Sequence, residues 1–323
     1  MRTLRTILTL VTVLVLAATA PSVDRARGQG TTLTLATGPG ISTMVGFAMQ
    51  SMVNDFVSGV RASTETADSE QQVLGWVSSG RVTLGLATIP EIARAFPTPE
   101  ERHRSGLSFV MGGHAAMVAH VFVRHDLPTP GIAGLQGRRV ALPEPGTPSE
   151  ALARAVLEVH GLTGRAIKPV FARVEEQVKA FEAGFVDAVI LAVSIPSPVV
   201  PSPAPTALAA GGKARLVSLD PGAVASLLEK FPGYSRHRIQ PGTYAGQAGL
   251  VLTVASKNAI VARNDVDLAL VYRFAKVILE NPGEFAKRCP LAVAYTPHNI
   301  LPESPVLPLH PGADRYYREQ GLH

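Results

Sequence analysis

The sequence predicts an α/β protein of two similar lobes around a cleft, with two hinge crossings between the lobes. Three observations predict this architecture. Apolar strand patterns alternate with helical patterns, which is typical of parallel sheets covered by helices. A strand–helix–strand–helix–strand pattern over residues 33–87 recurs over 138–192. Finally, a strand and a helix follow residue 249, so a chain that leaves the first lobe near residue 124 returns to it near 250.

The first element is "LTLATGPGISTM" (33–44), which combines a short apolar strand, a glycine-rich turn and hydroxyl side chains before a helix. The helix is predicted by apolar residues at helical spacing, namely Val45, Met49, Met52, Val53 and Phe56. Because a helix N-terminus leaves N–H groups free, such a turn favours the binding of an anion.

The rest of the first lobe continues the alternation. The next strand is "VRASTE" (60–65), and the helix after it begins at Asp68-Ser69 with Gln72 placed for a capping box. The apolar side of this helix consists of Val73, Leu74 and Val77. The segment "SSGRVTLGLA" (78–87) then supplies a glycine stop and a buried strand.

The second lobe repeats this order. "RRVALPEPGTPSEAL" (138–152) is strand, glycine turn, hydroxyls and helix, and "IKPVFARV" (167–174) is the next strand. After another helical pattern, "EAGFVDAVILA" (182–192) gives a glycine stop and a buried strand. The matching glycines stay in step, 104 and 106 positions apart (Gly80 and Gly184, Gly40 and Gly146). The two runs are therefore predicted to be two lobes of one architecture.

The second glycine turn ends at a helix start with polar side chains. Thr147 suits the N-cap, and Glu150 lies at the third helical position, which completes a capping box. Ser149 adds a second hydroxyl where N–H groups stay free. This turn is either a well-capped helix start or half of a binding site, whose other half has Thr37, Ser42 and Thr43. Two helix N-termini with hydroxyls and no lysine suit a carboxylate better than a nucleotide.

These patterns predict the organisation of the chain. Residues 1–28 form a signal peptide, 29–124 the first part of lobe I, and 125–249 lobe II. Residues 250–305 return to lobe I, and 306–323 form a C-terminal segment docked on lobe I. The return is marked by the strand "GLVLTVA" and by a periodic helix with Val266, Leu270, Phe274, Val277 and Ile278.

The first residues have the pattern of a secretory leader. Arg2 and Arg5 precede an apolar run, residues 7–20, that is too short to span a membrane comfortably. We expect cleavage before Gln29 and a location in the periplasm, with an uncleaved anchor as the alternative. Residues 1–30 hold four arginines and one aspartate, so the formal charge of +5 falls to about +2 without them. This balance gives no electrostatic footprint for nucleic acid.

The sequence lacks the patterns of common enzymes. It has no G-x-S-x-G elbow and no H-E-x-x-H pair, and its single cysteine, Cys289, excludes an intrachain disulfide. Three histidines near the first crossing (His114, His120 and His125) are interpreted as core or surface residues. We therefore expect no catalysis, no metal and no cofactor.

Three segments carry a resemblance to a known family. The closing segment is "LPLHPGADRYYREQGL" (307–322), "GTYAGQ" spans 242–247, and "GLQGRRVALPEPGTPSEALARAVLEVHGL" opens the second lobe. Together they resemble the TAXI group of solute-binding proteins, the extracytoplasmic receptors of TRAP-type transporters, over residues 31–322. The resemblance implies a type II periplasmic-binding fold, no catalysis, and capture of small carboxylates such as glutamate, glutamine or 2-oxo acids.

The resemblance also implies a set of ligand-binding residues at the turns and strand ends. They are Ser42, Thr43, Ser69, Thr88, Thr147, Ser149, Ser194, Pro196, Tyr244 and Gln247. Plain helix caps remain the alternative for Ser42, Thr43 and Ser69, and a hinge brace for Tyr244 and Gln247. The implied partners are a small carboxylate and TRAP-type permease subunits, and we expect a monomer without cofactor.

The chain departs from the family pattern in three segments. "TGPGISTM" (37–44) is short, Ala67-Asp68-Ser69-Glu70 replaces a Gly-Ser with a nearby Asn, and "SIPSPVVPSPAP" (194–205) is unusually rich in proline. These changes bear on the ligand rather than on the fold. Two other functions remain open: a binding protein of an ABC-type importer, for example for sulfonates or pyrimidine precursors, and a receptor that feeds a sensor kinase.

Overall fold

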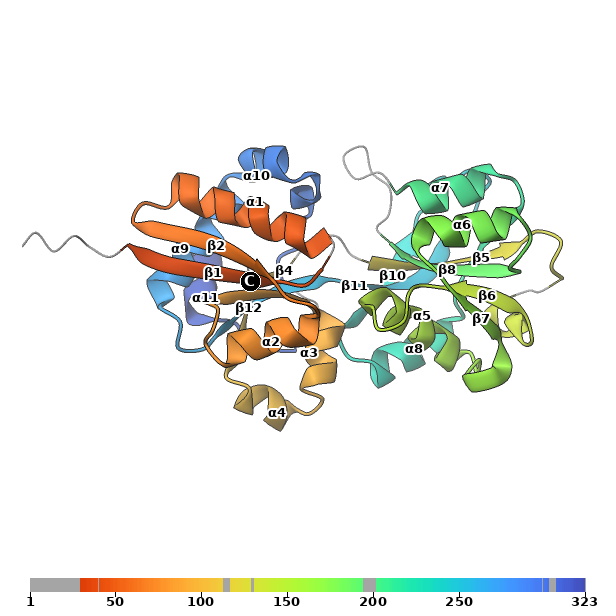
Figure 1. Ribbon diagram of the computed structural model, residues 1–323, viewed down its shortest axis with the longest axis horizontal. Coiled ribbons are helices and arrows are strands. Elements are labelled where there is room, and N and C mark those ends of the chain that lie inside the picture. The colour runs from red at the N-terminus through yellow and green to blue at the C-terminus, as the bar shows by residue number, and fades with distance from the viewer. Residues whose placement is uncertain are drawn as a thin grey trace, which may run out of the picture. The chain divides into compact units, whose positions relative to one another are not determined.

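The computed structural model describes residues 30–39, 41–112, 117–128, 131–193, 202–297, 299–301 and 306–322. Within these residues the strands form two sheets (Figure 1). The expected leader (1–28), the predicted site residues Ser194 and Pro196, and His114 lie outside the described residues. No helix in the described part of the chain has the length and apolar character needed to cross a membrane.

The first sheet has five strands in the order β2-β1-β3-β12-β4. They are β1 (Thr31–Thr37), β2 (Val60–Thr66), β3 (Leu84–Thr88), β4 (Leu107–Gly112) and β12 (Asn258–Arg263). Strand β1 runs parallel to β2 and β3, whereas β12 runs antiparallel to β3 and β4. Because β1 and β3 run in one direction, their carboxyl ends lie at the same edge of the sheet.

Helices cover both faces of the first sheet. One face carries α1 (Ile41–Phe56), α9 (Leu268–Glu280), α10 (Pro282–Arg288), the 3-10 helix η3 (Pro290–Ala294) and α11 (Pro311–Glu319), and the other carries α2 (Glu70–Ser78) and α3 (Ile89–Ala95). The short helix α4 (Pro99–Arg104) buries no side chain. Successive residues of a strand point to opposite faces, so Leu35 packs in the first of these cores and Ala36 in the second.

The second sheet has seven strands in the order β10-β11-β5-β8-β6-β7, with β9 paired to β5. They are β5 (Met117–Arg124), β6 (Arg139–Leu142), β7 (Lys168–Phe171), β8 (Ala188–Val193), β9 (Ala214–Val217), β10 (Tyr234–Ile239) and β11 (Val251–Ser256). Its helices are η1 (Ile132–Leu135), α5 (Pro148–Val159), η2 (Gly164–Ala166), α6 (Val174–Glu182), α7 (Pro203–Ala210) and α8 (Pro221–Lys230).

The expected repetition of the strand–helix pattern is confirmed. The run β1-α1-β2-α2-β3 gives the strand order β2-β1-β3, and the run β6-α5-β7-α6-β8 gives the same order β7-β6-β8. All neighbouring strands in both runs are parallel. Helices α1 and α2, and likewise α5 and α6, therefore begin at the strand ends of their own sheet. We call the parts built on the first and second sheets lobe I and lobe II.

The crossings between the lobes differ from the expected boundaries. Strand β5 falls within the residues expected in lobe I (29–124), yet it pairs with β8 in the second sheet. Strand β11 falls within the residues expected to return to lobe I (250–305), yet it pairs with β5 and β10. The chain thus crosses between β4 and β5 and again at Lys257. A buried apolar strand fits either sheet, so its sequence alone does not say which partner it takes.

The C-terminal segment packs on lobe I. Leu309 forms a parallel bridge with Phe109, and the Tyr317 hydroxyl donates to the Val110 carbonyl at 2.7 Å. Helix α11 lies against α9.

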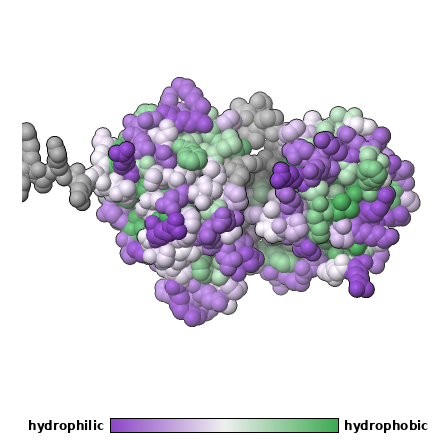
Figure 2. Space-filling model, in the orientation of Figure 1, coloured by the Kyte–Doolittle hydropathy of each residue, from purple (hydrophilic) through white to green (hydrophobic). Residues whose placement is uncertain are grey.

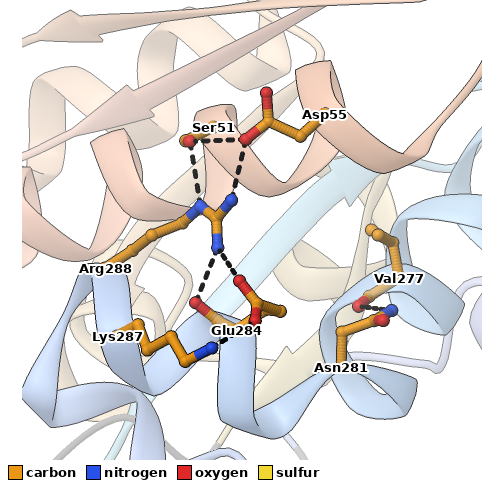
Figure 3. Close-up of polar contacts among 7 residues, drawn as sticks. All are labelled: Ser51, Asp55, Val277, Asn281, Glu284, Lys287 and Arg288. Carbon is orange, nitrogen blue, oxygen red and sulfur yellow. Dashed lines mark hydrogen bonds and ion pairs between the residues drawn. The ribbon is translucent and has the colours of Figure 1, made fainter.

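A second polar contact ties α10 to α1 (Figure 3). The Arg288 guanidinium donates to Asp55 Oδ2 at 2.8 Å and to Ser51 Oγ at 3.0 Å, and on its own helix to Glu284. This guanidinium holds the pKa of the Asp55 carboxyl below its usual value. At the end of α9, Asn281 donates to the Val277 carbonyl at 2.9 Å.

Gly312 sets how closely α11 packs on α9, so Gly312→Ala is expected to destabilise the fold. An added Cβ would lie 2.4 Å from the Leu268 carbonyl oxygen, which is a backbone atom that cannot rotate away. We expect a loss of about 1–3 kcal/mol in the free energy of unfolding, measured by chemical denaturation. Gly283→Ala is the control, because a Cβ there meets nothing within 4 Å. Equal stability of the two variants would contradict this account.

Candidate functional site

A cavity of about 450 Å³ lies between the two lobes and is lined by both. Lobe I contributes Thr88, Pro90, Glu91, Ala93, Arg94 and Pro97. Lobe II contributes Met117, Pro148, Ala151, Glu229, Lys230, Phe231, Pro232, Tyr234 and Ser256. The space-filling view shows the surface hollowed between the two lobes (Figure 2). We call this space the interlobe cavity.

The topology places polar side chains at this cavity. Strand β3 ends at Thr88, directly before α3, and helix α5 follows the end of β6. Strand β5 begins at Met117 and β11 ends at Ser256, and these two residues are paired in the second sheet. The ends of parallel strands and the starts of the following helices are the usual binding edge of such sheets.

Thr88 is a predicted site residue, and the structure places it in the wall of the interlobe cavity. Its hydroxyl oxygen accepts from the Glu91 N–H at 3.4 Å and so caps α3. Its own N–H and hydroxyl donate to Glu70 Oε2 at 2.8 and 2.7 Å. Burial raises the pKa of the Glu70 carboxyl, against the lowering effect of these two hydrogen bonds.

The predicted site residues of the first two helix starts are bonded to nearby backbone. The Ser42 and Thr43 hydroxyls each donate to the Gly38 carbonyl at 2.9 Å. The Ser69 hydroxyl oxygen accepts from the Gln72 N–H at 3.2 Å, and Gln72 Oε1 accepts from the Asp68 N–H at 2.7 Å. The glycine turn and the start of α2 are adjacent, because a Cβ on Gly38 would lie 3.3 Å from Glu70 Cγ.

The start of α5 differs in part from the sequence expectation. Thr147 is the N-cap, and its hydroxyl accepts from the Glu150 N–H at 3.2 Å. The Glu150 side chain, however, pairs with Arg154 one turn along the helix, so the expected capping box is only half formed. Ser149 lies beside the cavity, where its hydroxyl is 3.4 Å from the Ala192 carbonyl oxygen and 3.6 Å from Met117 Sδ.

Tyr244 and Gln247 lie away from the interlobe cavity. They line another cavity, of about 540 Å³, whose walls come from lobe II alone. Gln247 Nε2 donates to the carbonyls of Gln240 and Gly249 at 3.0 and 2.9 Å, and so braces its own loop. The Tyr244 hydroxyl lies 2.7 Å from Nε2 of the buried His120. Both side chains are therefore held by contacts within lobe II.

Six polar residues of the cavity wall carry no signal in the sequence: Glu91, Arg94, Glu229, Lys230, Tyr234 and Ser256. Glu91 and Arg94 form an ion pair on α3, with Arg94 Nε 2.8 Å from Glu91 Oε2. Tyr234 lies on β10, where burial and the negative charges of Glu91 and Glu70 raise the pKa of its hydroxyl. Ser256 is fully buried, and its Oγ has no hydrogen-bond partner among the described residues. These residues lie at the ends of strands and helices, and only the pairing of the strands into two sheets brings them together in the cavity wall.

Within the described residues, no group of three or more His, Cys, Asp or Glu side chains is placed to hold a metal ion. The polar groups of the cavity are instead hydroxyls, carboxylates, the Arg94 guanidinium, the Lys230 ammonium and helix N–H groups. Such groups bind and orient a small polar molecule through hydrogen bonds.

Acidification is expected to destabilise the protein through His120. Its Nδ1–H donates to the Val118 carbonyl at 2.9 Å, which leaves Nε2 to accept from Tyr244. Burial lowers the pKa of this imidazole to about 4, below the ordinary value of 6.5. The unfolded chain therefore binds the proton first, and the free energy of unfolding falls by about 3 kcal/mol as the pH drops from 6.5 to 4. Chemical denaturation across this range measures the fall.

Two variants distinguish the effect of His120 on stability from that of an exposed histidine. His120→Gln removes this titrating group and should make the curve between pH 6.5 and 4 less steep, whereas His237 and His310, whose pKa values burial also lowers, continue to contribute. His125→Gln, at an exposed position, should keep the slope of the parent protein. A His120→Gln curve as steep as that of the parent would show that other groups cause the loss.

Solved structures share this fold at low sequence identity. XAC2383 from Xanthomonas citri bound to ATP is 14% identical, with 90% of this chain and 97% of that chain covered and a TM-score of 0.54. A protein from Bordetella bronchiseptica RB50 is also 14% identical, with coverage of 91% and 99% and a TM-score of 0.51. The periplasmic aliphatic sulphonate binding protein SsuA from Escherichia coli is 18% identical, with coverage of 90% and 87% and a TM-score of 0.45.

The expected fold class is confirmed, since the chain has the two-sheet α/β fold of periplasmic-binding proteins. At the level of sequence families, residues 32–321 match the NMT1-like family. The NMT1-like match covers the residues of both sheets and of the interlobe cavity. It does not show the TAXI group, which remains an expectation from the closing segment. The chain therefore belongs to the NMT1-like family.

Proposed function

We propose that the protein is a solute-binding receptor that captures a small molecule in the interlobe cavity and delivers it to a membrane importer. The observation that carries the proposal is a cavity of about 450 Å³ with walls from both lobes. Pockets of this size suit small molecules, and a wall divided between two lobes is completed only when they approach each other.

The connection between the lobes supports closure around a ligand. Only Lys257 separates β11 of lobe II from β12 of lobe I. The Ile89 N–H, at the start of α3, donates to the Lys257 carbonyl at 3.0 Å, so this crossing stays attached to the cavity wall. Gly233 of lobe II touches the same wall, because an added Cβ would lie 2.7 Å from Pro90 N. Small rotations about such crossings would open or close the cavity.

We further propose that the ligand carries a carboxylate, which binds at the start of α5. Pro148 and Ala151 of this helix line the cavity, and Ser149 lies between them. The Ser149 N–H has no backbone partner among the described residues, as is usual in the first turn of a helix. A free N–H, a weakly bonded hydroxyl and the helix dipole together stabilise an anionic group.

The proposed partner is an ABC-type importer. The TRAP-type partner was implied by resemblance to the TAXI group, and the family that matches is the NMT1-like family. The ABC-type importer, which the sequence left open, is therefore the first candidate, and a TRAP-type permease is the second because of the segment 307–322. Either partner requires export to the periplasm, which we propose from the leader pattern, and neither requires catalysis by this chain.

Ligand binding is expected to bring the lobes together. Each lobe supplies only part of the polar contacts, so the bound state favours the closed arrangement. Small-angle scattering at saturating ligand should therefore give a smaller radius of gyration than the free protein. An unchanged profile at proven saturation would contradict closure.

Ser149→Ala is expected to weaken ligand binding without loss of stability. A hydrogen bond to a charged group contributes about 1.5–3 kcal/mol, so the affinity should fall roughly ten- to a hundredfold. The melting temperature of the free protein should stay close to that of the parent, because Thr147 keeps the cap of α5. The ligand is first found by a thermal-shift screen of amino acids, 2-oxo acids and dicarboxylates, and calorimetry then measures the affinities.

Thr147→Ala is the matched comparison for this prediction. It removes the cap and should lower the free energy of unfolding by about 1 kcal/mol, and the affinity should fall with it. If the only ligands found lack a carboxylate, or if Ser149→Ala binds as the parent does, the start of α5 is only a well-capped helix.

A further inference from the structure

Glu70 is a carboxylate beside the interlobe cavity that lacks a cationic partner among the described residues. Both of its hydrogen bonds come from Thr88 and reach the same oxygen, Oε2. Its other oxygen, Oε1, has no partner among the described residues. The positive charge of Arg94 acts on Glu70, but its guanidinium forms its ion pair with Glu91. A poorly solvated carboxylate without an ion pair of its own is costly unless another group supplies positive charge.

The position of Glu70 connects it to the cavity. Thr88, which holds the carboxylate, is itself in the cavity wall. Tyr234 lies in the wall from the other lobe, and its hydroxyl is close enough to feel the negative charges of Glu70 and Glu91. The carboxylate of lobe I and the tyrosine of lobe II therefore belong to one polar environment.

Ser256 gives an independent sign that a ligand completes this environment. Its side chain is 1% exposed and lies in the cavity wall, next to Tyr234 in the paired strands β10 and β11. Its Oγ has no hydrogen-bond partner among the described residues. Buried hydroxyls in proteins are rarely left unbonded, so a polar group in the cavity is the natural partner of this one.

We propose that the ligand carries a protonated amine and that Glu70 receives it. This inference rests on the proposed function, and it adds a specificity-determining residue to the cavity. Among the charged side chains of the wall, Glu91 is paired with Arg94 and Lys230 with Glu158, whereas Glu229 is exposed to solvent and belongs to lobe II, the lobe of the proposed carboxylate site. An amine at Glu70 in lobe I and a carboxylate at α5 in lobe II would place the two charged ends of one ligand on opposite lobes.

The choice between an amine and a neutral group follows from charge. An ammonium donates hydrogen bonds to the open Oε1 and neutralises the carboxylate. A keto oxygen at the same place accepts hydrogen bonds only and faces a negatively charged acceptor, so it gains nothing. The site should therefore separate an amino acid from the 2-oxo acid of the same shape.

The test uses pairs of probes that differ only in this group. Calorimetry on the whole protein compares L-glutamate with 2-oxoglutarate and L-alanine with pyruvate. We expect at least one amino acid to bind ten- to a hundredfold more tightly than its 2-oxo acid. Equal or tighter binding of the 2-oxo acids overturns the inference and leaves the proposed receptor function standing. No binding of any probe overturns both the inference and the proposed carboxylate ligand.

Glu70→Gln assigns the preference to this side chain. It keeps an acceptor for Thr88 and removes the charge, so the amino acid should lose ten- to a hundredfold in affinity while the 2-oxo acid loses little. Glu65→Gln is the control, since it makes the same change in charge on a side chain that pairs with Arg81 rather than with the wall residue Thr88. Retention of the amine preference in Glu70→Gln overturns the assignment. The probe pairs on the parent protein test the inference even if this variant does not fold.

Discussion

The crossing at Lys257 is the constraint on which the arrangement of the two sheets depends. Strand β11 of lobe II ends at Ser256, and β12 of lobe I begins at Asn258, so one residue joins the two sheets through extended chain. The Ile89 N–H donates to the Lys257 carbonyl, which fixes the start of α3 to this crossing. The end of β4 and the start of β5 lie near this crossing, because β4 pairs with β12 and β5 with β11.

Polar groups gather near this crossing. Strands β3 and β11 end at the interlobe cavity, and β5 begins there. The Thr88 hydroxyl in the cavity wall is already bonded to Glu70, and the expected site hydroxyls of Ser42 and Thr43 are bonded to Gly38. The polar groups that still lack a hydrogen-bond partner are therefore more informative about the ligand than the number of hydroxyls.

Family and fold leave the ligand open. The matched structures from Xanthomonas citri and Bordetella bronchiseptica share the fold at only 14% identity to this chain. Specificity in such proteins depends on a few side chains at strand and helix ends. In this chain Tyr234 of lobe II lies near Glu70 of lobe I, and burial together with the negative charges of Glu91 and Glu70 raises the pKa of its hydroxyl.

The sequence by itself determined the local features. The alternation of strands and helices, the repeated order in the two lobes and the caps at Ser69 and Thr147 follow from patterns and contacts within a few residues. The Gln72 side chain accepts from the Asp68 N–H, so the expected capping box with Ser69 is not formed. Only the tertiary structure decided the long-range pairs. It placed β5 and β11 in the second sheet, and Thr88 on Glu70, 18 positions away. It joined Tyr244 to His120 across 124 positions. Local sequence patterns reflect secondary-structure propensity and helix capping. The partner of a buried strand or polar group depends instead on which surfaces meet when the whole chain packs.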